Sequence, residues 1–172
     1  MSYRISKQWL FTTTYLPRLF GKIIIPDFVY HEIVVVGKEL PGAKEIAEAD
    51  WVYTAAPCTN STLVEKLLLN LDRGEAEAIA LALELHADNI LIDEYLGRRI
   101  AIEYNLRPLS ILGILLKAKS EGLISEVKPI MDDLRKVARF FINPKLYEPN
   151  IPKPFNELIP QLRVLALVVR FD

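Results

Sequence analysis

The 172-residue sequence is poor in cysteine, in long apolar runs and in net charge. Its single cysteine, Cys58, excludes an internal disulfide framework and fits a reducing compartment. No apolar run approaches the roughly 18 residues that are needed to span a bilayer. The net charge of -1 provides no global positive field that would attract nucleic acid. We therefore expect a cytoplasmic protein with no membrane partner, in which any contact with nucleic acid depends on local basic residues.

The sequence also contains no glycine-rich phosphate loop and no Ser–His or Cys–His arrangement typical of nucleophilic enzymes. Apolar residues, in contrast, are abundant, at 51% of the chain. The mean hydropathy of +0.20 is on the apolar side for a soluble protein. This excess indicates either a well-buried sheet or an apolar surface that binds a partner.

Short apolar runs alternate with segments of helical periodicity, which predicts an α/β domain with a parallel sheet. Residues 23–25 form a β-branched strand that Pro26 stops, and residues 90–92 read as a strand buried on both faces. Prolines recur from Pro144 onward, so that part of the chain cannot be one regular element. We expect one domain over 1–147 and a proline-rich tail over 148–172. Helices are predicted at 26–36, 41–49, 63–70, 73–87, 96–104, 111–120 and 125–139.

Carboxylates follow two of these strands at the edge where the carboxyl ends of parallel strands meet. Asp93 and Glu94 come directly after residues 90–92, Glu75 and Glu77 open the preceding helix, and Glu32 follows the strand at 23–25. Several acids held together repel one another unless an ion resolves the repulsion. Carboxylate oxygens are the ligands that Mg²⁺ and Mn²⁺ prefer. The spacing is therefore compatible with a divalent-cation site.

Each of these acids also has a purely structural explanation. Asp72 and Glu75 have the spacing of a capping box at a helix start, and Asp93 suits the N-cap of the following helix. Glu32 and Glu77 would then be solvated helix residues. Two arginines after the strand, Arg98 and Arg99, belong either to the solvated surface or to a phosphate contact.

Five motifs in one order resemble a PIN-domain family of VapC-like toxins, the group long catalogued as a domain of unknown function. The resemblance covers residues 23–147. The motifs are IPDFVYHEI at 25–33, PGA at 41–43, GEAEAIALA at 74–82, IDEYLGR at 92–98 and LGILLKAK at 112–119.

The resemblance implies a three-layer α/β/α fold with a mainly parallel central sheet. It also implies a Mg²⁺- or Mn²⁺-dependent ribonuclease, the toxin of a toxin–antitoxin pair, with RNA, a cognate antitoxin and a second copy of the chain as partners. The implied catalytic acids are Glu32, Glu75 and Asp93. The implied metal ligands are Glu32, Glu75, Glu77 and Asp93. The choice between Glu75 and Glu77 for the third acid, and between Asp93 and Glu94 for the fourth, stays open.

The N-terminal region departs from this family. Members usually begin with an apolar strand that leads into an aspartate or asparagine, whereas residues 6–14 here read SKQWLFTTT and no acid precedes Asp27. We therefore expect the first strand to be altered or missing. This departure leaves catalysis open and supports an alternative function, a catalytically degenerate PIN-like protein that serves as a dimerisation or antitoxin-binding module.

Overall fold

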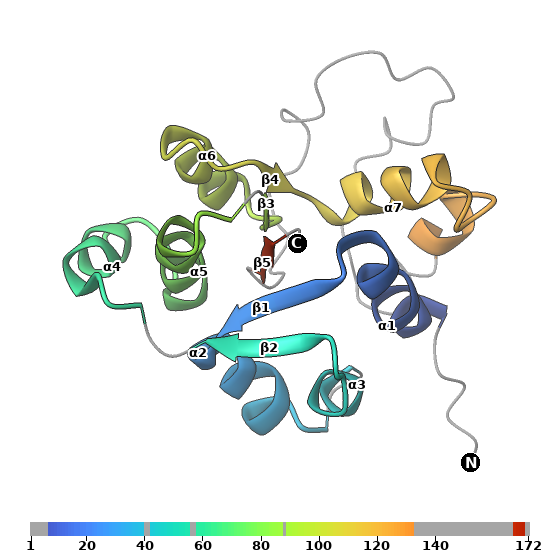
Figure 1. Ribbon diagram of the computed structural model, residues 1–172, viewed down its shortest axis with the longest axis horizontal. Coiled ribbons are helices and arrows are strands. Elements are labelled where there is room, and N and C mark those ends of the chain that lie inside the picture. Colours follow the sequence, from blue (N-terminus) through green and yellow to red (C-terminus); the bar gives the residue numbers. More distant parts are fainter. Residues whose placement is uncertain (1–6, 40–41, 56–57, 88, 133–166, 171–172) are drawn as a thin grey trace.

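The computed structural model describes residues 7–39, 42–55, 58–87, 89–132 and 167–170. Figure 1 shows α4 (Ser61–Leu67), α5 (Arg73–Glu84) and α6 (Tyr95–Glu103) on one side of the strands and α1 (Lys7–Phe20) and α7 (Ile111–Ser120) on the other. No helix in the described ranges is long and apolar enough to cross a membrane. The helices are α1 Lys7–Phe20, α2 Asp27–Tyr30, the π-helical segment η1 His31–Val36, α3 Ala43–Ala47, α4 Ser61–Leu67, α5 Arg73–Glu84, α6 Tyr95–Glu103 and α7 Ile111–Ser120.

The strands alternate their side chains between two apolar cores, one on each face of the sheet. Ile23, Ile25 and Leu91 belong to the core that α1 and α7 cover. Ile90 and Ile92 belong to the core under α4, α5 and α6. Burial on both faces explains the continuous apolar runs at 23–25 and 90–92. The three-layer α/β/α architecture predicted from the sequence is confirmed.

The sheet has the strand order β2-β1-β5-β3-β4. Parallel pairs form between β1 (Lys22–Pro26) and β2 (Val52–Ala55), and between β3 (Asn89–Leu91) and β4 (Pro108–Leu109). The remaining strand, β5 (Leu167–Arg170), lies between β1 and β3 and is antiparallel to both. Four strands therefore run in one direction, and the sheet is mainly parallel as predicted.

The central strand of this sheet comes from the segment 148–172, which the sequence marks as a tail. Val168 of β5 is opposite Ile24 on one side and Ile90 on the other. At the N-terminal end, residues 7–20 form α1, so the described part of the chain has no strand ahead of β1. Within the described residues, the N-terminal region that departs from the family thus forms a helix instead of the usual first strand.

Two predicted helices differ in kind or lie partly outside the described residues, whereas the ends of the others agree with the structure to within three residues. The helix expected at 26–36 begins as α2 and continues with the wider π-helical turns of η1. The helix expected at 125–139 begins at residue 128 in the described range, and its part beyond residue 132 lies outside the described residues.

Candidate metal centre

The start of α5 sets the geometry of the acidic site. Asp72 is the N-cap of this helix, and its Oδ1 accepts a hydrogen bond from the backbone N–H of Glu75 at 2.9 Å. An N-cap acceptor satisfies one of the unpaired N–H groups of the first turn. The cap predicted from the sequence is therefore present, and it places two carboxylates on one helical turn.

Glu94 brings a third carboxylate to this turn. One carboxylate oxygen each from Asp72, Glu75 and Glu94 lies within 4.8 Å of the other two. Glu94 is the N-cap of α6, with an extended backbone at φ -68° and ψ 136°. We call these three side chains the acidic cluster. The sequence alone predicts only a capping role for Asp72, although its spacing of three residues from Glu75 places both at the same helix end.

Glu75 is the buried member of the acidic cluster, with 5% of its surface exposed. Burial, and then the nearby carboxylates of Asp72 and Glu94, raise the pKa of Glu75 to about 7. A divalent cation between the three groups would neutralise this repulsion. Three hard oxygen donors this close together fit Mg²⁺ or Mn²⁺ with water completing the coordination.

Gly97 allows the first turn of α6 to lie against the carboxylate of Glu75. A Cβ atom at this position would stand 2.6 Å from Oε1 of Glu75 and 2.5 Å from Cδ1 of Ile92. Any larger residue would therefore displace the carboxylate or the buried isoleucine. The close approach also brings Glu75 to a helix N-terminus, where negative charge is favoured.

Glu32 lies near Asp72 at the start of α5. A Cβ atom added to Gly74 would stand 3.7 Å from Oε2 of Glu32. The same atom would stand 3.5 Å from Oδ1 of Asp72. The side chain is exposed, as expected at the rim of a site. The structure thus brings Glu32 close to Asp72 without including it among the three clustered oxygens.

Glu77 is placed differently from Glu75. It is 6% exposed, and its Oε1 accepts a hydrogen bond from Nε of Arg73 at 2.7 Å. The guanidinium of Arg73 also lies 4.3 Å from the ring centre of Phe28, which joins α5 to α2. Glu77 is therefore the buried partner of an ion pair with the more exposed Arg73, not a solvated helix residue, and it lies outside the acidic cluster.

Asp93 points into the protein rather than toward the acidic cluster. It is 1% exposed, and its Oδ1 accepts a hydrogen bond from the backbone N–H of Ile111 at 3.0 Å. Burial raises the pKa of Asp93 to about 6, against the opposing effects of this hydrogen bond and of the Arg98 charge. Arg98 is 5% exposed and its charge interacts with that of Asp93, whereas Arg99 lies at the surface near Glu103.

The central strand supplies no carboxylate to this edge of the sheet within its described residues. Leu167 of β5 is opposite Leu91, close to the carboxyl end of β3, and the strand continues away from that edge as Val168, Val169 and Arg170. The acidic cluster is consequently built from helix starts alone.

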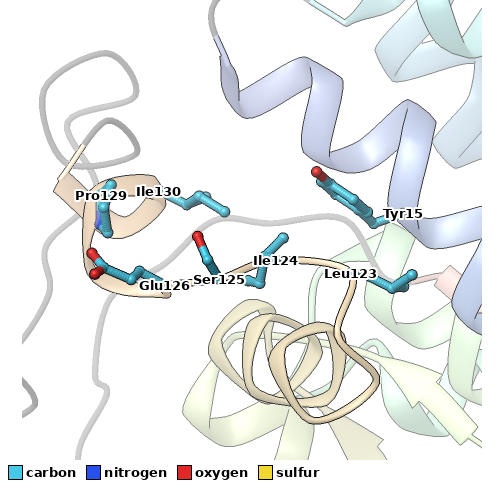
Figure 2. Close-up of a pocket in the computed structure, with 7 residues that line it drawn as sticks. All are labelled: Tyr15, Leu123, Ile124, Ser125, Glu126, Pro129 and Ile130. Carbon is cyan, nitrogen blue, oxygen red and sulfur yellow. The ribbon is translucent and has the colours of Figure 1, made fainter.

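A pocket of about 400 Å³ lies elsewhere, between α1 and the segment that follows α7. Figure 2 shows Tyr15 of α1 facing Ile124 and Ile130, with Ser125 and Glu126 on the same segment as these isoleucines. None of the clustered acids lines this pocket, so it is separate from the candidate metal centre.

A family model described as a PIN domain matches residues 12–154, most of the chain. The chain therefore belongs to the PIN-domain family, as its motifs and its α/β fold indicate. PIN domains are typically divalent-metal-dependent nucleases that act on RNA or DNA. The search of curated proteins and the search of solved structures each found no match.

Proposed function

We propose that this PIN-domain protein is a Mg²⁺- or Mn²⁺-dependent endoribonuclease, the toxin of a VapC-like toxin–antitoxin pair. The observation that carries the proposal is the acidic cluster, in which a buried glutamate is crowded by two further carboxylates. Such crowding disfavours the folded state unless a cation or a proton is bound. The family membership supplies the nucleolytic reaction class.

The residues have separate roles in this proposal. Asp72, Glu75 and Glu94 would hold the cation, which would lower the pKa of a bound water and neutralise charge on the reacting phosphodiester. Gly97 leaves room for Glu75 at the α6 start. Glu32 completes the acidic rim beside Asp72, on the side of α2 and η1. Glu77 would not bind the cation. It would instead hold Arg73 against the ring of Phe28, and so help to keep α5 packed on α2.

A toxin of this kind would act in the cytoplasm and would be neutralised by an antitoxin. Exposed apolar side chains are available for such a partner, among them Val36 at 72% and Leu69 at 81% exposure. A homodimer is the expected form of the toxin in the absence of the antitoxin.

A second candidate function is a PIN-like binding module without nuclease activity. The observation that favours it is the central strand, whose described residues Leu167–Arg170 include no acid. Fewer carboxylates hold a cation less firmly, and an open geometry is less suited to catalysis. The module would still pair with itself or with an antitoxin.

The purified chain incubated with RNA and either Mn²⁺ or Mg²⁺ distinguishes the two functions. The nuclease function predicts cleavage that a chelator stops and that Glu75→Gln and Asp72→Asn each reduce by about 100-fold or more. Asparagine retains an acceptor for the α5 cap, so Asp72→Asn tests the charge separately from the cap. Glu65→Gln, on the exposed side of α4, is the control and should cleave normally. Binding of Mn²⁺ without any cleavage would favour the second function.

A further inference from the structure

Asp93 and Glu94 are adjacent in the sequence, yet their carboxylates lie on opposite sides of the chain. Asp93 is buried against Ile111, whereas Glu94 joins the acidic cluster. The backbone at Glu94 is extended, and successive side chains of an extended chain point in opposite directions. Only one of the two residues can therefore face the cation when the other faces inward.

The inward carboxylate of Asp93 joins three elements. It follows β3, it accepts the N–H of Ile111 at the first position of α7, and the positive charge of Arg98 on α6 attracts it. Oδ2 of Asp93 and Nη2 of Arg98 are buried and have no hydrogen-bond partner among the described residues. A buried charge is costly unless an opposite charge compensates it, and the charges of Asp93 and Arg98 attract each other here.

We propose that Asp93 is a positioning residue, which anchors the end of β3 to α6 and α7 so that Glu94, rather than Asp93 itself, faces the cation. This inference rests on the proposed function, because it assigns roles around the same acidic cluster. With Asp93 anchored, the chain enters α6 with Glu94 as N-cap and turned toward Glu75. Without the contacts of Asp93, the end of β3 is no longer fixed relative to the start of α6. The carboxylate of Glu94 is then no longer held beside Glu75.

The test compares four variants by titration calorimetry with Mn²⁺, below the thermal transition and after circular dichroism has confirmed folding. Glu94→Gln removes the carboxylate of the acidic cluster at constant size. Asp93→Asn removes the charge and retains an acceptor for Ile111, whereas Asp93→Ala removes both. Asp50→Asn, at an exposed aspartate, is the matched control for the loss of one charge.

For the positioning role, Glu94→Gln weakens Mn²⁺ binding by about tenfold or more, and Asp93→Ala does so by about tenfold. Asp93→Asn should bind Mn²⁺ with an affinity within about threefold of that of the unmodified chain. Its melting temperature should still fall by roughly 3 °C or more, because Arg98 loses its counter-charge. Asp50→Asn leaves both quantities unchanged.

Two results would overturn the inference alone. If Asp93→Asn binds Mn²⁺ as weakly as Glu94→Gln, then Asp93 is itself a ligand. If Asp93→Ala binds Mn²⁺ with unchanged affinity while its melting temperature falls, then Asp93 stabilises the fold and positions nothing. Failure of the unmodified chain to bind Mn²⁺ is a different result, since it removes the cation site of the proposed function together with this inference.

Discussion

At the residue scale, the carboxylates of the acidic cluster repel one another, and the surrounding helices hold them close together. Glu75 is held between the start of α6 and two other carboxylates, and its pKa is raised from the usual 4.5 to about 7. Asp93 is buried in a different environment, and its pKa is raised from 3.8 to about 6. Both shifts mean that the folded chain holds a proton more tightly than the unfolded chain.

We predict that stability falls as the pH rises from about 5 to 7.5 when no divalent cation is present. Between pH 4.5 and about 7 the folded state retains a proton on Glu75 that the unfolded state has lost, so the free energy of unfolding decreases with pH. Above about pH 7 both states have lost the proton and the curve levels off. The full shift corresponds to about 3 kcal/mol as an upper limit. Thermal melts across this pH range would measure the slope.

Thermal melts of variants show which residue causes the fall in stability with pH. Asp93 contributes in the same direction only up to about pH 6, so the decrease between pH 6 and 7 belongs to Glu75. Glu75→Gln should flatten that interval, and Glu65→Gln should not. Added Mn²⁺ should raise the melting temperature more at pH 7.5 than at pH 5. A stability that rises from pH 6 to pH 7 without cation would contradict the buried, crowded state of Glu75.

At the scale of elements, two helices carry a glycine at the third position after the N-cap, and the two glycines have different surroundings. Gly97 of α6 lies against Glu75 and Ile92, where a Cβ would come within 2.6 Å of either side chain. Gly113 of α7 has only Oγ of Ser110 nearby, at 3.5 Å from an added Cβ, which is an ordinary contact. The pair therefore separates helix propensity from close packing.

We predict that Gly113→Ala is neutral or stabilises the protein by up to about 1 kcal/mol, because alanine is the better helix former. Gly97→Ala should instead destabilise it by about 1 kcal/mol, since overpacking of about 1–3 kcal/mol exceeds the gain in propensity. Because the displaced atom belongs to Glu75, Gly97→Ala should also weaken Mn²⁺ binding, and Gly113→Ala should leave it unchanged. Urea unfolding and Mn²⁺ titration measure the two effects. Equal stabilisation by both substitutions would contradict the tight contact.

At the scale of the whole molecule, β5 connects the two parallel pairs of the sheet. It is paired with β1 on one side and with β3 on the other. The position of β1 relative to β3 is therefore fixed through β5. Glu32 follows β1 in the sequence, and Glu94 follows β3. The integrity of the site therefore depends on a strand that contributes no acid to it within the described residues.

We predict that Val168→Pro destabilises the whole domain. Proline has no N–H for the strand ladder and is excluded from central strands, so the cost should be at least about 2 kcal/mol. For a chain of this size the melting temperature should fall by roughly 5 °C or more. Val168→Thr, which keeps the N–H and the branched shape, is the control and should cost less. An unchanged melting temperature in Val168→Pro would show that β5 does not occupy the centre of the sheet in solution.

The features that the sequence predicted well are those with local causes. The alternation of apolar runs with helical periodicity predicted the layers, and residues 23–25 and 90–92 predicted strands buried on both faces. The spacing of Asp72 and Glu75 predicted the start of α5. The start of α4 is less clear from local spacing: Thr62 and Glu65 have the spacing of a capping box. In the structure, however, Asn60 caps α4 and accepts the N–H of Leu63. Several nearby polar residues can compete for one cap, and local spacing does not choose between them.

The sequence by itself determined the family, the layers and the region of the acids, because motif order and hydrophobic periodicity are written along the chain. Only the tertiary structure decided which of the neighbouring acids lie together. Glu75 and Glu77 lie roughly 200° apart around a helix, and Asp93 and Glu94 point in opposite directions, so the surrounding elements select one of each pair. The tertiary structure also placed β5 between β1 and β3. Strand pairing between distant segments depends on which edges remain available after the rest of the sheet has formed, and no local pattern encodes that choice.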